Sequence, residues 1–187
     1  SQVIAARLQV EGNEVSAVHR RAAGVVLAAG GASRLGQPKQ LLDWHGQPFV
    51  RAVAETALAA HLHPVVVVTG AYHQEVSAAL EGLPIEVVHN PDWELGQSTS
   101  VRAAVAALSR LSQAVGTAVF LLVDQPQIPV TLVRALLDTY AKTLSPIVAP
   151  LVDNRRGNPV LFDQQTFSSL AAVEGDCLLY TSPSPRD

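Results

Sequence analysis

The 187-residue sequence is 48% hydrophobic and 16% charged, with a formal net charge of -3. This composition is typical of a compact globular protein with an apolar core. The slightly acidic balance excludes a general basic field for nucleic acid or anionic membranes, so any phosphate binding must be local. The longest apolar runs, such as residues 65–68 and 118–123, are too short to span a bilayer. Because the start shows no signal peptide and the single cysteine, Cys177, excludes an internal disulfide, we expect a cytoplasmic protein.

Both ends of the chain differ from an ordinary domain sequence. The chain has no methionine, even at its first position, and we expect residues 1–22 to be a tail or the end of an upstream segment. Residues 177–187 match one reading frame of a transposase-type sequencing adapter, so we interpret them as a non-native tail. The alternative is an ordinary proline-containing surface tail. The predicted domain therefore covers residues 23–176 and is truncated at its carboxyl end.

Short apolar strands and amphipathic helices alternate along the chain. Residues 24–29 form a small-apolar run that enters a glycine pair, the pattern of a buried parallel strand. Further strands are predicted at residues 65–69, 85–88, 117–123, 147–152 and 160–162. Helices are predicted at residues 49–60, 72–80, 98–111 and 129–140, the third with Ser98 or Thr99 as its cap. This alternation predicts a three-layer α/β domain with a largely parallel sheet.

The loop after the first predicted strand carries the features of a triphosphate site. Gly30 and Gly31 leave backbone amides open to a closely approaching phosphate, and Arg34 and Lys39 add positive charge suited to a leaving pyrophosphate. The loop lacks the third glycine of the dinucleotide fingerprint and the Gly-Lys-Ser/Thr of a Walker loop. We therefore interpret it as a nucleotidyltransferase loop; the alternative is an ordinary turn with two solvated cations.

Two other polar segments, residues 90–100 and 124–126, also follow predicted strands. Because ligands of an open parallel sheet bind at the carboxyl ends of the strands, we expect all three segments to converge. Asp124 is either a metal ligand or the cap of the next helix. Residues 96–100 are rich in glycine and hydroxyl groups, which suits reading a base edge or starting a helix.

Other residue types that often mark sites have simpler interpretations here. His61 and His63 have no evident third ligand nearby, so we expect a solvated turn rather than a metal site. Trp44 and Trp93 are interpreted as packing residues, with Trp93 near the nucleotide loop.

Residues 27–36 read Leu-Ala-Ala-Gly-Gly-Ala-Ser-Arg-Leu-Gly, and residues 38–42 read Pro-Lys-Gln-Leu-Leu. Together they resemble the signature of the molybdenum cofactor nucleotidyltransferases, and in particular of the cytidylyltransferases. The likeness covers most of residues 24–176, since the motifs at residues 96–100, 124–126, 157–162 and 175–176 follow in the family's order. The resemblance implies a Rossmann-like fold of the nucleotide-diphospho-sugar-transferase type with a mixed sheet edge. It also implies transfer of CMP from CTP to the terminal phosphate of molybdopterin, with release of pyrophosphate.

The resemblance also implies roles for individual residues. The implied catalytic residues are Arg34, Lys39 and Asp124. Nucleotide binding is implied for Ala28, Ala29, Gly30, Gly31, Ser33, Gly96 and Ser100. The implied cofactor is Mg²⁺ bridging the triphosphate oxygens, held by Asp124 and by Asp176 of the late Gly-Asp pair. The implied partners are CTP, molybdopterin or the molybdenum cofactor, and a molybdenum hydroxylase that receives the product.

Three positions bear on substrate choice. Ala29 stands where guanylyl-transferring relatives usually carry glycine, and its methyl group would narrow the pocket, which favours CTP over GTP. Leu35 replaces a frequent methionine. Asn158 replaces a frequent histidine and leaves the acceptor open.

Three other functions stay open as alternatives. One is a related transferase that uses GTP or another phosphorylated acceptor, such as a sugar or polyol phosphate. The second is an oxidoreductase of the same broad family, although the glycine pattern, with Arg34 and Lys39, argues against a nicotinamide site. The third is a non-catalytic molybdenum cofactor-binding accessory protein, which would not need Asp124.

Overall fold

The computed structural model describes residues 5–11, 14–31, 37–111 and 115–173. Its main sheet has seven strands in the order β6-β5-β2-β7-β11-β8, with β1 paired to β2 off this path. Their bounds are β1 Ala5–Glu11, β2 Glu14–Ala28, β5 Val65–Thr69, β6 Glu86–His89, β7 Val115–Leu122, β8 Ile147–Val148 and β11 Val160–Asp163. β6, β5, β2 and β7 run parallel, whereas β11 is antiparallel to both β7 and β8. The predicted α/β fold with a mostly parallel, mixed-edge sheet is confirmed.

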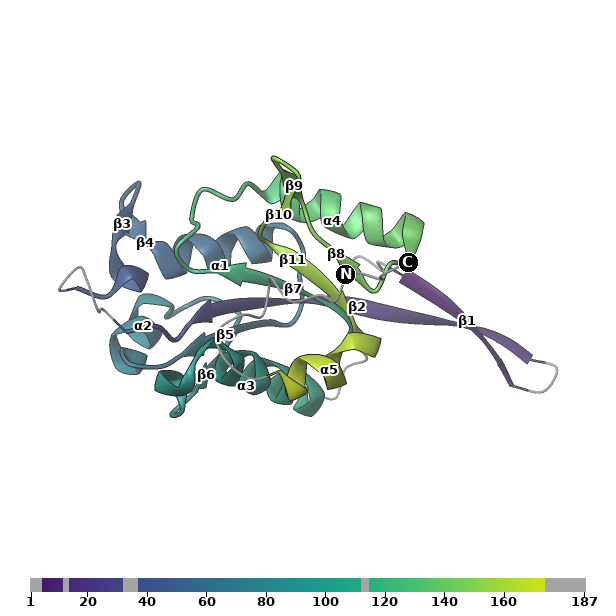
Figure 1. Cartoon of the computed structure of the whole chain (residues 1–187), viewed down its shortest axis with the longest axis horizontal. Helices are drawn as coiled ribbons and strands as arrows, with labels where there is room; N and C mark the ends of the chain where they lie inside the picture. Colours follow the sequence, from purple (N-terminus) through teal and green to yellow (C-terminus); the bar gives the residue numbers. More distant parts are fainter. Residues whose placement is uncertain (1–4, 12–13, 32–36, 112–114, 174–187) are drawn as a thin grey trace.

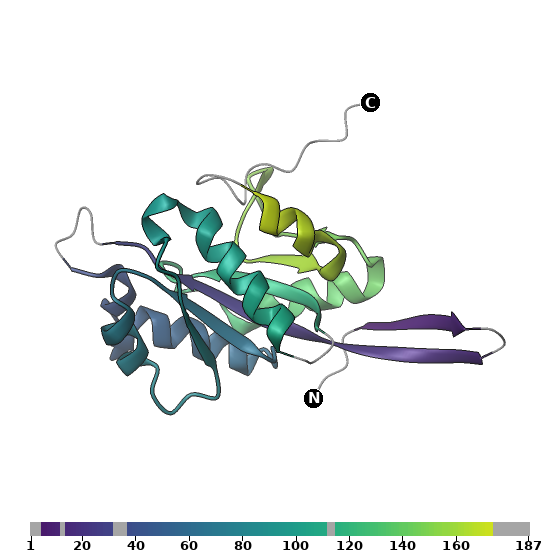
Figure 2. The same ribbon diagram turned by 90° about the horizontal axis from the view of Figure 1, so that it is seen from below.

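Helices cover both faces of the sheet. α1 (Phe49–Ala59), α2 (His73–Ala79) and α4 (Val130–Thr143) pack on one face, and α3 (Gln97–Arg110) and α5 (Phe167–Ala172) on the other (Figure 1). Seen from below, α3 and α5 lie side by side (Figure 2). The sequence of β5 is continuously apolar because both faces of the strand are buried. Val65 and Val67 join the core under α1, and Val66 and Val68 join the core under α3.

Most predicted elements are found within two residues of their expected bounds. Two strands differ. The strand expected at residues 24–29 is only the end of β2, which begins at Glu14 and pairs with β1 before it enters the sheet. The predicted domain start at residue 23 therefore falls inside a strand. The β1–β2 hairpin projects from the end of the sheet opposite to the carboxyl end of β2 (Figure 1).

The strand predicted at residues 147–152 is wrong as a single element. β8 is followed by β9 (Leu151–Val152), which leaves the main sheet and pairs with β10 (Arg155–Arg156). Pro150 separates the two strands, and proline has no N–H to donate to a sheet. Asp153 and Asn154 adopt positive φ angles of 50° and 58°, which close the β9–β10 hairpin tightly.

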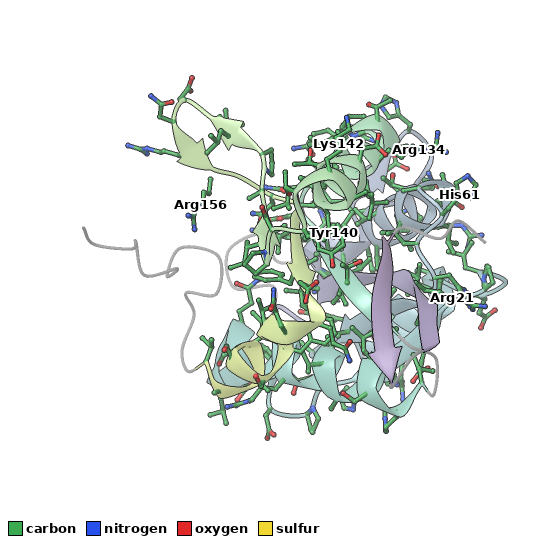
Figure 3. All side chains as sticks on the ribbon, turned by 90° about the vertical axis from the view of Figure 1, so that its right-hand side faces the viewer. Arg21, His61, Arg134, Tyr140, Lys142 and Arg156 are labelled. Carbon is green, nitrogen blue, oxygen red and sulfur yellow. The ribbon has the colours of Figure 1, made fainter. Side chains whose placement is uncertain are left out.

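The end of β11 is tied to α4 by a buried polar contact. The Tyr140 side chain lies between α4 and the sheet (Figure 3), and its hydroxyl donates to Asp163 Oδ2. Asp163 Oδ1 also accepts from the Gln165 N–H at 2.9 Å, which caps the short 3-10 helix η3 (Gln164–Thr166) before α5. A buried carboxylate is tolerated here because its oxygens have donors. Within the described part of the chain, no helix is long and apolar enough to cross a bilayer.

Candidate functional site

The carboxyl ends of β2 and β7 form the floor of a cleft of about 720 Å³. The two strands are adjacent and parallel, with Leu27 opposite Leu122, and the Val123 N–H donates to the Leu27 carbonyl at 3.3 Å. The glycine loop and Asp124 therefore leave the sheet at the same edge, as expected for a parallel sheet. The cleft is lined by Leu27, Ala29, Gly30, Gly31, Lys39, Gln40, Trp93, Glu94, Gly96, Gln97, Ser100, Leu122, Val123 and Asp124.

The structure brings most of the sequence-predicted site residues to this cleft. Seven of them line it: Ala29, Gly30, Gly31, Lys39, Gly96, Ser100 and Asp124. Ala28 lies in the core under α1 and is not among the lining residues. Ser33, Arg34 and Asp176 lie outside the described residues. The functional roles of all of these residues stay predictions.

The two loop glycines have different surroundings. A Cβ at Gly30 would meet no atom of the described residues within 4 Å, whereas a Cβ at Gly31 would lie 2.9 Å from the Trp93 ring. Trp93 also packs against Gly70 at the end of β5, where a Cβ would lie 2.7 Å from the Trp93 Cβ. The packing interpretation of Trp93 is therefore confirmed, and its ring also forms part of the cleft wall.

Gln40 is a site residue that the sequence interpretation did not assign. It lies in a 3-10 helix, η1 (Lys39–Leu41), as the only buried residue of that helix. Its Nε2 donates to the carbonyl oxygens of Ala28 at 2.9 Å and Gly30 at 2.6 Å. The one available signal was that a polar glutamine directly precedes the apolar pair Leu41-Leu42.

A buried hydrogen-bond network holds the second loop of the cleft. Asn90, which follows β6, is buried, and its Nδ2 donates to the hydroxyl oxygens of Thr99 at 2.8 Å and Ser100 at 3.0 Å. The Thr99 hydroxyl in turn lies 2.8 Å from the Gly96 carbonyl and 3.0 Å from the Asp92 carbonyl. Because the Ser100 oxygen accepts from Asn90, its hydroxyl proton can be donated to a ligand in the cleft. The sequence did not indicate this role of Asn90, because its hydrogen-bond partners are nine and ten residues away.

The predicted cap of α3 at Ser98 or Thr99 is wrong. The residue before the helix is Gly96, with φ 110° and ψ 168°, and no side chain caps the first turn. Only glycine adopts this backbone region readily. Gly96 therefore lets the chain turn directly from the 3-10 helix η2 (Trp93–Leu95) into α3, and the hydroxyl groups bond to the loop instead.

Asp124 does not cap the following helix. The residue preceding α4 is Pro129, which has no capping side chain, and Asp124 is exposed at the cleft. It forms no ion pair with any described residue. The structure therefore removes the capping alternative for Asp124. An exposed carboxylate beside the glycine loop is the kind of oxygen donor that Mg²⁺ prefers, and Mg²⁺ commonly needs only one or two carboxylates together with substrate phosphates.

The two other groups that were considered as sites lie elsewhere. His61 and His63 are exposed in the turn between α1 and β5, at the opposite end of β5 from the cleft. Within the described residues, no three His, Cys, Asp or Glu side chains gather to hold a metal ion. Trp44 packs edge-on against Phe49, with ring centroids 6.2 Å apart.

Asn158 lies beside the carboxyl end of β7. β11 is antiparallel to β7, with Val160 opposite Phe120, so the residues before β11 continue along the last residues of β7. The Asn158 Oδ1 atom and the Gln125 Oε1 atom are both buried, and neither accepts a hydrogen bond from a described residue. Asn158 is thus on the Asp124 side of the sheet edge rather than on the Ser100 side.

The family of the MobA-like NTP transferase domain matches residues 24–181, which include the whole cleft. The chain belongs to this family. Membership makes it a nucleotidyltransferase by family, in agreement with the expectation from the loop. The chain is also 37% identical over 161 residues to a protein of Paenarthrobacter nicotinovorans named nicotine blue oxidoreductase, a match that covers 82% of this chain and 76% of that protein.

The match to a named cytidylyltransferase is shorter. The chain is 34% identical over 85 residues to the molybdenum cofactor cytidylyltransferase of Escherichia coli K12, covering 45% of this chain and 44% of that enzyme. Among solved structures, Rv0371c from Mycobacterium tuberculosis H37Rv superposes with a TM-score of 0.76 at 28% identity, covering 89% of this chain and 85% of that chain. A structure of Rv0371c in complex with manganese superposes with a TM-score of 0.67 at 28% identity, covering 83% and 78%.

Proposed function

We propose that this protein transfers CMP from CTP to the terminal phosphate of molybdopterin or the molybdenum cofactor and releases pyrophosphate. The observation that supports it most is the convergence of an open glycine loop, Lys39 and Asp124 on one cleft. A triphosphate needs close backbone approach, positive charge and a metal-binding carboxylate, and this cleft offers all three. The substrates are water-soluble, and we place the reaction in the cytoplasm.

The chemistry at the triphosphate is an in-line displacement. A terminal phosphate oxygen of the acceptor attacks the α-phosphorus of CTP. A new phosphorus–oxygen bond forms, the bond from the α-phosphorus to the oxygen shared with the β-phosphate breaks, and pyrophosphate leaves. The Lys39 ammonium, exposed at the cleft, balances the charge that develops on the leaving group. Arg34 has the same proposed role.

Asp124 is the proposed ligand of Mg²⁺, with Asp176 as the proposed second ligand. Bound Mg²⁺ would supply charge neutralisation across the triphosphate oxygens. Asp124 fits this role because its carboxylate is exposed at the cleft and unpaired among the described residues. The manganese complex of Rv0371c supports a divalent cation in the wider family.

The base is proposed to lie between the glycine loop and the start of α3. Ala29 and Ser100 both line the cleft, and Ser100 presents a hydroxyl whose oxygen already accepts from Asn90. A methyl group at Ala29 reduces the width available to the base, which favours the smaller ring of cytosine over guanine. A further role of Ala28, Ser33 and Gly96 in holding the nucleotide belongs to the same proposal.

The acceptor is proposed to approach from the β7–β11 side, where Asn158 lies. A molybdenum hydroxylase is the proposed recipient of the product. The name of the Paenarthrobacter relative favours one second candidate, an oxidoreductase activity, because that protein is 37% identical over most of this chain. The remaining candidate is a related nucleotidyltransferase that uses GTP or another phosphorylated acceptor.

One assay separates these functions. The chain is incubated with Mg²⁺, each of the four NTPs in turn, and molybdopterin with or without bound molybdenum, and pyrophosphate is measured. The proposal expects release with CTP and molybdopterin together, and a new CMP-containing product. Pyrophosphate release with GTP alone among the NTPs would replace CMP transfer by GMP transfer. Absence of release with every NTP, combined with reduction of nicotine blue by an added electron donor, would establish the oxidoreductase instead.

A further inference from the structure

We propose that Gln40 is a positioning residue for nucleotide transfer, because its side-chain amide sets the course of the glycine loop and the place of Lys39. The inference rests on the proposed function, since Gln40 acts through groups that are assigned there to the triphosphate. Gln40 is 3% exposed, and its Nε2 donates to the carbonyls of Ala28 at 2.9 Å and Gly30 at 2.6 Å.

These two hydrogen bonds connect the two ends of the loop. Ala28 is the last residue of β2, and Gln40 lies twelve residues later in η1. The Gln40 side chain therefore connects the end of the loop to the last residue of β2. Lys39 directly precedes Gln40 and lines the cleft. Because Lys39 adjoins Gln40 in the chain, the hydrogen bonds of Gln40 fix the backbone position from which the lysine side chain reaches the cleft.

The chemistry of the contact explains why an amide is suited to this position. The carbonyl oxygens of Ala28 and Gly30 carry partial negative charge close to the proposed triphosphate site. Without a donor, the buried Ala28 carbonyl would be costly, and both carbonyls would repel phosphate oxygens. The Gln40 NH₂ group supplies both donors without adding charge. A glutamate in its place has no proton to donate at neutral pH and would add a negative charge.

On the opposite side, the described part of the loop packs against Trp93, and the Ala71 N–H donates to the Ala29 carbonyl at 3.4 Å. Gly31 lies against the Trp93 ring, at a distance that leaves no room for a Cβ. The loop is therefore held by the side-chain hydrogen bonds of Gln40 on one side and by an aromatic ring and this backbone contact on the other. Trp93 also provides a spectroscopic readout of nucleotide binding, because Trp44 is the only other tryptophan in the sequence.

The test uses two variants of Gln40 and a matched control in the full chain. Gln40→Met keeps the length of the side chain and removes the donors, and Gln40→Glu replaces them by a carboxylate. The control is Gln74→Glu, which makes the same chemical change on an exposed residue of α2 that does not line the cleft. We expect each Gln40 variant to raise the KM for CTP at least about tenfold, as for loss of buried hydrogen bonds, and the control to stay within about twofold.

The pH profile separates positioning from a general loss of structure. The ordinary glutamate pKa of about 4.3 is raised by burial, so the carboxyl introduced by Gln40→Glu regains one proton as the pH falls. The activity of Gln40→Glu relative to wild type should therefore rise between about pH 7 and pH 5, while the relative activity of Gln40→Met stays flat. A flat profile for both variants would overturn the proposal, and so would a KM for Gln40→Met within twofold of wild type.

Failure of the proposed function would be seen separately. If wild type releases no pyrophosphate, Mg·CTP is titrated into the Trp44→Phe background and Trp93 fluorescence is followed. A dissociation constant at least about tenfold higher for Gln40→Met than for the background supports the role of Gln40 in holding the nucleotide loop. Equal dissociation constants overturn it. If Gln40→Met does not fold, the pH profile and titration of Gln40→Glu decide the question.

Discussion

Gly30 and Gly31 are adjacent in the sequence, but the atoms that surround them differ. The space beside Gly30 is open, and the space beside Gly31 is filled by the Trp93 ring. Packing within the described protein would therefore tolerate a side chain at Gly30. This is the behaviour expected of a residue whose free space is reserved for a ligand. Gly31 is required by the protein itself.

This difference predicts opposite results for two neighbouring substitutions. Gly30→Ala should leave the free energy of unfolding within about 0.5 kcal/mol of wild type and weaken Mg·CTP binding, because the new methyl group enters the ligand space. Gly31→Ala should lower the free energy of unfolding by about 1 kcal/mol or more through overpacking against Trp93. Urea denaturation and nucleotide titration measure the two quantities. Equal losses of stability in both variants would contradict this distinction.

Asp124 and Lys39 are both exposed, so each can be changed with little effect on folding. Asp124→Asn removes the charge proposed to hold the divalent cation, and Lys39→Ala removes the charge proposed to lie beside the leaving group. We expect each to lower turnover at least about tenfold, with melting temperatures close to wild type. Asp138→Asn and Lys142→Ala, exposed on α4, are the matched controls. Near-normal turnover in Asp124→Asn or Lys39→Ala would refute the role given to that residue.

At the scale of elements, the cleft depends on how β6 is joined to α3. Asn90 follows β6 and bonds to Thr99 and Ser100 in the first turn of α3. The hydroxyl groups in that turn are held by a residue outside the helix, so the orientation of Ser100 is a property of the loop and helix together. Gly96 allows the connection because its backbone conformation excludes other residues.

Asn90→Ala should therefore affect both stability and nucleotide binding. The substitution removes the donor to the Thr99 and Ser100 oxygens and the acceptor of the Asp92 N–H, which costs about 1–3 kcal/mol of unfolding free energy, and it frees Ser100 to rotate. Ser109→Ala is a suitable control, because the Ser109 hydroxyl donates only to the Val105 carbonyl of its own helix in the described structure. Urea denaturation and the KM for CTP measure the effects. Wild-type stability in Asn90→Ala would show that the network contributes little.

At the scale of the whole molecule, the main sheet and the β1–β2 hairpin are separable. β1 pairs with β2 over residues 5–20, whereas β2 pairs with β5 and β7 only from Arg21 onward. The hairpin also projects from the end of the sheet opposite to the carboxyl end of β2 (Figure 1), where the cleft lies.

Removing residues 1–20 should thus leave the cleft and the core intact. We expect the shortened chain to keep a cooperative unfolding transition and a KM for CTP within about twofold of the full chain. Circular dichroism during thermal unfolding and the pyrophosphate assay test this. Loss of the cooperative transition would show that the first strand belongs to the folding unit.

Local patterns were sufficient for most elements. Residues 65–69 were recognised as a strand from four consecutive valines ending at Thr69, and residues 49–60 as a helix from the spacing of Val50, Val53 and Ala57, all buried in the structure. Topology then followed from the alternation, so the convergence of the loop, Lys39 and Asp124 was also predictable. Local patterns failed where the deciding partner is distant: β9 pairs with β10 rather than extending β8, and Thr99 bonds to the loop instead of capping α3.

The sequence by itself determined the class of fold and the family, and it predicted a nucleotide-binding role for the glycine loop, because these depend on residue order within single elements and on motif spacing. Only the tertiary structure showed that Gln40 joins the ends of the loop, that Asn90 orients Ser100, and that Gly31 serves Trp93 while Gly30 is open. The physical reason is that a hydrogen bond or a packing contact needs two partners in space. These partners lie ten or more residues apart in the chain, a separation that no local pattern encodes.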